Sequence, residues 1–273
     1  MIVTGMVLLS IGVADVARQF LHGRVLRIVL GVGAVAVLVL AVLTAAPLAG
    51  LLAVALAVVW VWLFPARVPA RAGFWPAVAL AVLCIVFVAV LGPREEAGLL
   101  GAVWDVPTPW GPLSVDHTLL LVGAVCILLE SGNVIVRAAL ASEMPASIQT
   151  IEASEASASG AASLDPEVDS PDGEPVTEGG APAVPPATPT PTLKGGRLIG
   201  PLERIIVFAL TLTGVYSLLA AVLAAKGIVR FPEISRDGET GSRAEYFLIG
   251  SLVSWVVALA AAFLVWWALS GVV

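Results

Sequence analysis

Long apolar runs separated by short polar breaks dominate the chain. Such runs cover Val25–Ala46, Leu48–Phe64, Trp75–Leu91, Thr118–Leu140, Ile205–Ala225 and Tyr246–Leu269. A helix needs about 20 apolar residues to cross the hydrocarbon core of a bilayer. A seventh run, Ile2–Phe20, carries Asp15 and Arg18 and is the least secure span. The pattern therefore predicts an all-α fold, a polytopic transmembrane bundle of six or seven spans.

A polar segment divides these runs into two groups. Residues 141–195 consist largely of Ala, Ser, Pro, Glu and Asp, with little apolar surface to bury. Such a composition cannot offset the entropy cost of ordering. We therefore predict an N-terminal membrane unit of about five helices over 1–140 and a disordered acidic linker over 141–195. A two-helix membrane hairpin over 196–273 follows the linker.

Composition supports the membrane assignment and suggests the compartment. The 273 residues are 59% hydrophobic and only 12% charged, about half the charged fraction of a soluble domain. The net charge of −6 arises in the linker, because residues outside 141–192 carry more bases than acids. Arginine far outnumbers lysine, and Ala, Val and Gly abound, which is typical of a GC-rich bacterial genome. We expect a multi-pass protein of the bacterial plasma (inner) membrane.

The positions of the basic residues indicate the orientation of the first spans. Cytoplasmic loops of membrane proteins are enriched in Arg and Lys. The rule places Arg18, Arg24 and Arg27 in the cytoplasm, together with Arg67 and Arg71. Simple alternation of spans then places the bases between 226 and 243 outside, which the rule disfavours. The sidedness of the C-terminal hairpin stays open at this level.

Glu203 and Arg204 stand side by side at the start of the apolar run Ile205–Ala225. In one interpretation Gly200 caps the helix and Pro201 occupies its first position. The positive end of the helix dipole then stabilises the negative charge of Glu203. Arg204 would then extend to the lipid headgroups at the membrane edge. In the other interpretation, the two charges belong to a specific polar cluster.

Three sequence blocks bear on this choice: "GRLIGPLERIIVF", "AAKGIVRF" and "AEYFLIGSLVSW". They resemble the C-terminal part of an uncharacterised family of bacterial multi-pass membrane proteins, a domain of unknown function, over about residues 196–255. Gly227 stands where that family usually has Ser, Ser251 where it has Thr, and its N-terminal part has no counterpart here. The resemblance implies no activity. It implies a distinctive unit formed by Gly200, Glu203, Arg204, Lys226, Arg230, Glu245, Tyr246 and Gly250.

Further polar residues extend the candidate cluster. Glu130 lies near the middle of the run Thr118–Leu140, where a charge is costly and usually paired or functional; alternatively, the span ends early and leaves Glu130 at the interface. The full candidate intramembrane polar cluster comprises Glu130, Asn133, Arg137, Glu203 and Arg204. Neighbours on a helix point about 100° apart, so Glu203 and Arg204 each need a partner elsewhere. In a continuous span Lys226 would lie about 34 Å from Glu203, so we expect a contact between Glu203 and Arg137.

Small residues recur every four positions in the two C-terminal runs. They are Ser217, Ala221 and Ala225 in the first run and Gly250, Ser254, Ala258 and Ala262 in the second. Stripes of this kind let helices approach closely. We therefore expect the two runs to pack as an antiparallel hairpin along this helix-packing stripe.

Enzyme signatures are missing from the sequence. It contains no H-E-x-x-H, G-x-S-x-G or phosphate-binding loop, and Cys84 and Cys126 form neither a disulfide framework nor a metal motif. We expect no catalytic residue, no metal site, no cofactor and no nucleic-acid partner. The preferred function is a non-enzymatic membrane module that binds a protein partner or a second copy. The alternative is a small transporter or channel with a proton- or cation-linked site around Glu130, which would place Glu130 and Glu203 at one polar cavity.

Overall fold

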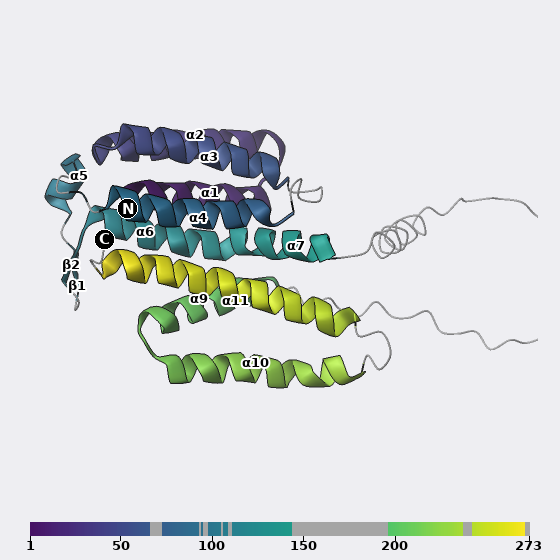
Figure 1. Cartoon of the computed structure of the whole chain (residues 1–273). Coiled ribbons are helices and arrows are strands. Elements are labelled where there is room, and N and C mark those ends of the chain that lie inside the picture. Colours follow the sequence, from purple (N-terminus) through teal and green to yellow (C-terminus); the bar gives the residue numbers. More distant parts are fainter. Residues whose placement is uncertain are drawn as a thin grey trace, which may run out of the picture. The chain divides into compact units, whose positions relative to one another are not determined.

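The computed structural model describes residues 1–65, 73–92, 94, 98–104, 106–108, 111–143, 196–236 and 242–270 (Figure 1). Nearly all of them are helical, apart from a small antiparallel pair of strands. The elements are α1 (Ile2–Phe20), α2 (Gly23–Leu43), α3 (Pro47–Leu63), α4 (Trp75–Leu91), α5 (Gly98–Val103), β1 (Val106–Thr108), β2 (Gly111–Leu113), α6 (Val115–Cys126), the π-helical segment η1 (Ile127–Ser131), α7 (Gly132–Glu143), α9 (Gly196–Leu212), α10 (Tyr216–Arg236) and α11 (Ser242–Leu269). The predicted linker lies outside the described residues, except for 141–143, which end α7.

Within the residues that the structure describes, four helical stretches are long and apolar enough to cross a membrane. They are Ile2–Phe20, Gly23–Leu43, Val115–Ala141 and Phe247–Leu269, and the shorter apolar helices are Pro47–Leu63, Trp75–Leu91 and Tyr216–Ile228. The protein is therefore an all-α, multi-pass integral membrane protein, as the sequence predicted. The number of spans, six or seven, stays a prediction.

Helix α1 occupies the centre of the N-terminal part, between α6 on one side and α2 and α3 on the other (Figure 1). Its contact with α6 is unusually close: a Cβ atom on Gly5 would lie 2.7 Å from the backbone of Leu119, and one on Gly12 would lie 2.6 Å from that of Cys126. Only glycine allows such an approach. The run that looked least like a span is thus the most buried of the four candidate spans.

This central position explains how α1 carries two charges. Asp15 is 2% exposed and forms an ion pair with Arg18 one turn later. Trp60 of α3 donates its indole N–H to Asp15 Oδ2 at 2.9 Å, and Arg18 Nη1 donates to the carbonyl of Phe64 at 2.7 Å. Asp15 and Arg18 therefore form an ion pair that is surrounded by protein rather than lipid.

The apolar run Ile205–Ala225 is not one span, because a turn at Thr213–Val215 divides it into α9 and α10. Gly214 has φ +71°, a left-handed conformation that glycine adopts without strain. The amide of Val215 donates to Leu210 O at 3.1 Å and that of Gly214 to Thr211 O at 3.2 Å. These two bonds form a Schellman motif, which ends helices. The described residues of the C-terminal part therefore form three helices, α9, α10 and α11, rather than the two expected.

The predicted stripe of small residues is divided between two different surroundings. On α11, Ser254, Ala258 and Ala262 are buried and Gly250 faces Leu140 and Val136 of α7. Helix α11 packs against α7, α6 and α4. On α10, in contrast, Ser217, Ala221 and Ala225 are exposed. The expected packing of the two stripes against each other is therefore wrong.

Candidate functional site: a polar network around Arg204

Arg204 of α9 joins three helical segments through its guanidinium group. The side chain is buried at 2% exposure. Its Nε donates to Ser254 Oγ of α11 at 3.0 Å, its Nη1 donates to the backbone carbonyl of Leu128 at 2.8 Å, and its Nη2 donates to Asn133 Oδ1. Each guanidinium nitrogen thus has a different acceptor, an arrangement that suits the planar donor set of arginine.

The acceptor at Leu128 belongs to the π-helical turn η1. A π-helical turn shifts the backbone bonding from i→i+4 to i→i+5 and is often found at functional positions. Leu128 lies 13 residues from each end of the apolar stretch Val115–Ala141. At 1.5 Å per residue this places its carbonyl about 20 Å from either end. Arg204 is therefore bound in the middle of the bundle, and the predicted position at the membrane edge is wrong.

Two glycines make room for the guanidinium. A Cβ atom on Gly132 would lie 2.6 Å from Arg204 Nη1, and one on Gly200 would lie 3.3 Å from Asn133 Oδ1 and 3.4 Å from Arg204 Nη2. Gly200 is thus a packing position and not the expected N-cap, because α9 begins at Gly196 and Pro201 lies inside the helix. The interpretation of Glu203 as a first-turn residue is wrong for the same reason.

Glu130 belongs to the same network. It is 7% exposed, and the helix continues through it to residue 143, so the alternative in which the span ends at Glu130 is wrong. Asn133 Nδ2 donates to Glu130 Oε2 at 3.1 Å, and Arg137 Nη2 lies 3.6 Å from Glu130 Oε1. Asn133 therefore links the carboxylate of Glu130 to the guanidinium of Arg204.

Glu203 points away from this network into a second cluster. Its carboxylate oxygens both accept from Lys226 Nζ of α10 at 2.6 Å, and Oε1 also accepts from Trp255 Nε1 of α11 at 2.7 Å. Lys226 Nζ lies 5.4 Å from the centroid of the Trp255 ring and 5.7 Å from that of Phe247. Both the predicted Glu203–Arg137 contact and the exclusion of Lys226 by distance are wrong, because the turn at Gly214 brings α10 back alongside α9.

The structure thus connects four of the five candidate residues through direct side-chain contacts: Glu130, Asn133, Arg137 and Arg204. Glu203 has a separate set of partners, although it is the neighbour of Arg204 on α9. The expectation that two adjacent charges require partners on other segments holds for both. Sequence reasoning missed Lys226, Trp255 and the Leu128 carbonyl as partners. The signal for Lys226 was present in "TLTG", a helix-ending glycine inside an apolar run.

The polar groups of Arg204 and Glu203 are bound within the protein. Every nitrogen of the Arg204 guanidinium has an acceptor, and Glu203 holds three hydrogen bonds. Among the described residues, no group of three or more His, Cys, Asp or Glu side chains lies close enough to hold a metal ion. The arrangement can cross-link α9 to η1, α7, α10 and α11 inside an apolar medium, where polar side chains need internal partners.

Comparisons of the chain with family models, with curated proteins and with solved structures gave no significant match.

Proposed function

We propose that this chain is a non-enzymatic integral membrane protein that self-associates through its C-terminal helices. The contact between two copies is the outward face of α10, formed by Ser217, Ala221 and Ala225. One observation supports this most directly: among the described side chains of α10, Tyr216–Ile228, only Leu219 is buried. An apolar helix with so little packing of its own has most of its surface free for a partner.

The ion pair of Lys226 with Glu203 fixes which face of α10 points outward. Successive residues on a helix are rotated by about 100°. Lys226 and Leu219 therefore lie about 140–160° around the helix from the centre of the Ser217–Ala221–Ala225 face. The charged anchor points toward α9 and α11, so the small-residue face points away from them.

A flat face of small residues suits a second copy of itself. Small side chains let two backbones approach closely, and association of helices in lipid depends on such packing. In a two-fold symmetric dimer the same patch contacts itself. The three outward residues carry no charge, and the charges of Glu203 and Lys226 are used within one chain.

The contacts of the two glutamates weaken the case for a transporter. That function needs a shared polar site near the membrane midplane. Glu203 binds Lys226 and Trp255, whereas Glu130 binds Asn133 and Arg137. With separate partners, the two carboxylates give no support to a common ion-binding site.

The test compares two neighbouring alanines on α10 that receive the same change. Ala221→Leu places a large side chain on the proposed contact face, while Ala220→Leu places it about 100° away on another exposed part of the helix. We expect the wild type and Ala220→Leu to form dimers in lipid nanodiscs or mild detergent, measured by native mass spectrometry and light scattering. Ala221→Leu should be largely monomeric.

Two results would contradict the proposal. One is a wild-type chain that stays monomeric over a wide concentration range in lipid. The other is an Ala221→Leu variant that dimerises as well as Ala220→Leu. If Ala221→Leu instead loses a different protein that co-purifies with the wild type, the face binds a heterologous partner and self-association is wrong.

A further inference from the structure

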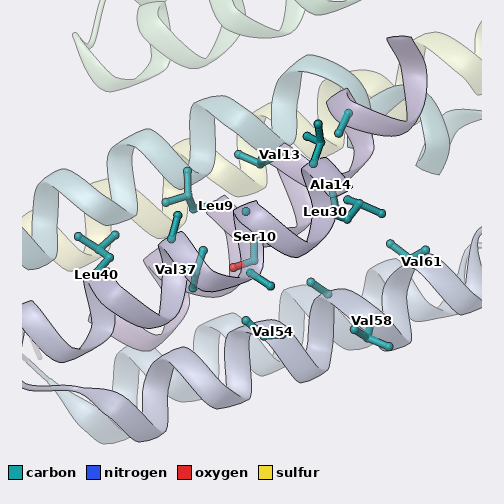
Figure 2. A pocket seen from close by; sticks show the side chains of 16 residues that line it. Leu9, Ser10, Val13, Ala14, Leu30, Val37, Leu40, Val54, Val58 and Val61 are labelled. Carbon is teal, nitrogen blue, oxygen red and sulfur yellow. The ribbon is translucent and has the colours of Figure 1, made fainter. Parts of the chain in front are cut away.

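An apolar groove of about 340 Å³ lies between α1, α2 and α3, and Figure 2 shows the side chains that line it. The lining residues lie within Leu9–Ala17 of α1, Val29–Leu40 of α2 and Val54–Val61 of α3. Ser10 is the one polar residue among them, and its hydroxyl already donates to the carbonyl of Met6 at 2.7 Å. The wall therefore offers an occupant almost nothing but hydrocarbon contact.

The groove is open to the bilayer because α2 is loosely packed. Of the 21 residues of α2, only Ala41 is buried. Ala41 lies near the end of the helix, where it meets Gly50 of α3 so closely that a Cβ atom on Gly50 would lie 2.4 Å away. Along the rest of α2, hydrocarbon from the surrounding membrane can reach the groove without any helix being displaced.

The length of the groove matches one leaflet of a bilayer. From Val29 to Leu40, α2 advances 11 residues, or about 16 Å. Half of a hydrocarbon core about 30 Å thick is about 15 Å. A single acyl chain lying along α2 could therefore fill the groove from its basic end toward the middle of the membrane.

One end of the groove carries positive charge. Arg24 and Arg27 lie in the first turns of α2, just before the first lining residue of that helix, Val29, and both are exposed. Ala17, the last lining residue on α1, lies at the same end because α1 and α2 are joined by the short turn at Leu21–His22. Guanidinium groups bind phosphate strongly and with two parallel bonds.

We propose that this groove is a binding site for an anionic phospholipid, with one acyl chain between α1, α2 and α3 and the phosphate on Arg24 and Arg27. Basic residues at the cytoplasmic ends of membrane helices select anionic headgroups, and the positive-inside rule places these two arginines on that side. The site lies entirely on α1–α3, so it does not depend on self-association through α10.

Two glycines on α2 provide a matched pair of variants for the acyl chain. A Cβ atom on either Gly31 or Gly33 would meet nothing within 4 Å, so both tolerate a larger residue. Gly33 lines the groove and Gly31 is absent from its lining. Gly33→Leu should project a side chain into the groove and block an acyl chain, while Gly31→Leu adds the same side chain to another face of the helix.

The experiment titrates the purified full-length chain in neutral detergent with phosphatidylglycerol or phosphatidylcholine, counting bound lipid by native mass spectrometry. We expect the wild type and Gly31→Leu to prefer phosphatidylglycerol by about tenfold. Gly33→Leu should bind no more than about one-sixth as much of either lipid as the wild type. The double variant Arg24→Gln/Arg27→Gln should retain phosphatidylcholine binding but lose the preference for the anionic lipid.

Circular dichroism and thermal melting of each variant show whether it has kept its fold. Equal binding of phosphatidylglycerol by folded Gly33→Leu and Gly31→Leu would overturn the groove as the site. An unchanged lipid preference in the folded arginine double variant would overturn the headgroup assignment. If the wild type binds no lipid and the Gly33→Leu substitution converts its dimer to a monomer, a second copy occupies the groove. The lipid proposal would then fail.

Discussion

The guanidinium of Arg204 lies directly against the backbone of Gly132, where a Cβ atom would come within 2.6 Å of Nη1 and 2.8 Å of Cζ. The neighbour is thus a planar group held by three hydrogen bonds, which cannot move aside as a flexible aliphatic chain would. Only glycine at this position lets the buried arginine reach Leu128 and Asn133 together.

Gly132→Ala should therefore displace Arg204 and leave buried donors without acceptors. Such a loss costs about 1–3 kcal/mol, more than the gain in helix propensity of about 1 kcal/mol from replacing glycine. The matched control is Gly227→Ala on α10, where a Cβ atom meets nothing within 4 Å. Unfolding in mixed micelles should show Gly132→Ala less stable and Gly227→Ala unchanged or more stable; equal stability of the two would contradict this account.

Arg204 should not be replaceable by lysine. Lysine presents one nitrogen, whereas Arg204 reaches Ser254, the Leu128 carbonyl and Asn133 from three different nitrogens. Hydrogen bonds inside membrane proteins average about 0.6 kcal/mol each and reach about 1.7 kcal/mol. We expect Arg204→Lys to lose about 1–3 kcal/mol in the free energy of unfolding.

Arg137→Lys provides the comparison for Arg204→Lys. The side chain of Arg137 is 64% exposed and lies 3.6 Å from Glu130, and exposed ion pairs contribute little to stability. Its replacement by lysine should change the unfolding free energy by less than about 0.5 kcal/mol. If the two arginines tolerate lysine equally well, the three-acceptor geometry of Arg204 is not what stabilises the bundle.

The coupling between Glu203 and Lys226 can be measured with a double-mutant cycle. Glu203→Gln keeps an acceptor for Trp255 Nε1, and Lys226→Met keeps the aliphatic chain beside the Phe247 and Trp255 rings. We expect a coupling energy of about 1 kcal/mol or more for this partly buried pair. The parallel cycle with Glu203→Gln and Arg137→Met should give a coupling near zero. A larger value for the second cycle would restore the contact predicted from the sequence.

The turn between α9 and α10 also predicts the orientation of the C-terminal part. Because α10 returns alongside α9, the start of α11 lies at the level of α7, where Gly250 faces Leu140. Arg230 and Arg236, which follow Lys226 toward the end of α10, then lie toward the same side as Arg137, which satisfies the positive-inside rule. A single span over Ile205–Ala225 would place them on the opposite side.

Cysteine labelling distinguishes these two orientations. Ser235→Cys in α10 and Ser270→Cys after α11 should react with a membrane-impermeant maleimide from opposite sides, Ser235→Cys only from the cytoplasm. Cys84 and Cys126 would first be replaced by alanine to remove background reaction. Labelling of Ser235→Cys from the outer side of intact cells would show that α9 and α10 do not form a returning pair.

The class of the protein and its helices were readable from the sequence because they depend on local properties. Apolar runs of membrane length form helices in lipid, since a single segment has no other way to satisfy its backbone hydrogen bonds there. The spacing of Asp15 and Arg18 allowed an ion pair, because residues three apart share a helix face, but it did not decide that the pair forms. The need of Glu203 and Arg204 for partners outside α9 followed from helix periodicity alone.

The identities of those partners were decided by tertiary structure. Hydropathy averages over a window, so it joined α9 and α10 into one run across Gly214, and a distance calculated along that run excluded Lys226. The depth of Arg204 depended on the packing of α9 against η1 and α11, which brought acceptors from Leu128 and Ser254 to its guanidinium. The rule that small residues mark a helix contact could not separate α11 from α10, because the sequence carries the same spacing in both. The small residues of α11 are buried, whereas those of α10 are exposed. The sequence determined which segments form helices in lipid, because that depends on the hydrophobicity of each segment alone. The tertiary structure decided which segments lie within hydrogen-bond distance of one another, because that depends on how the helices pack.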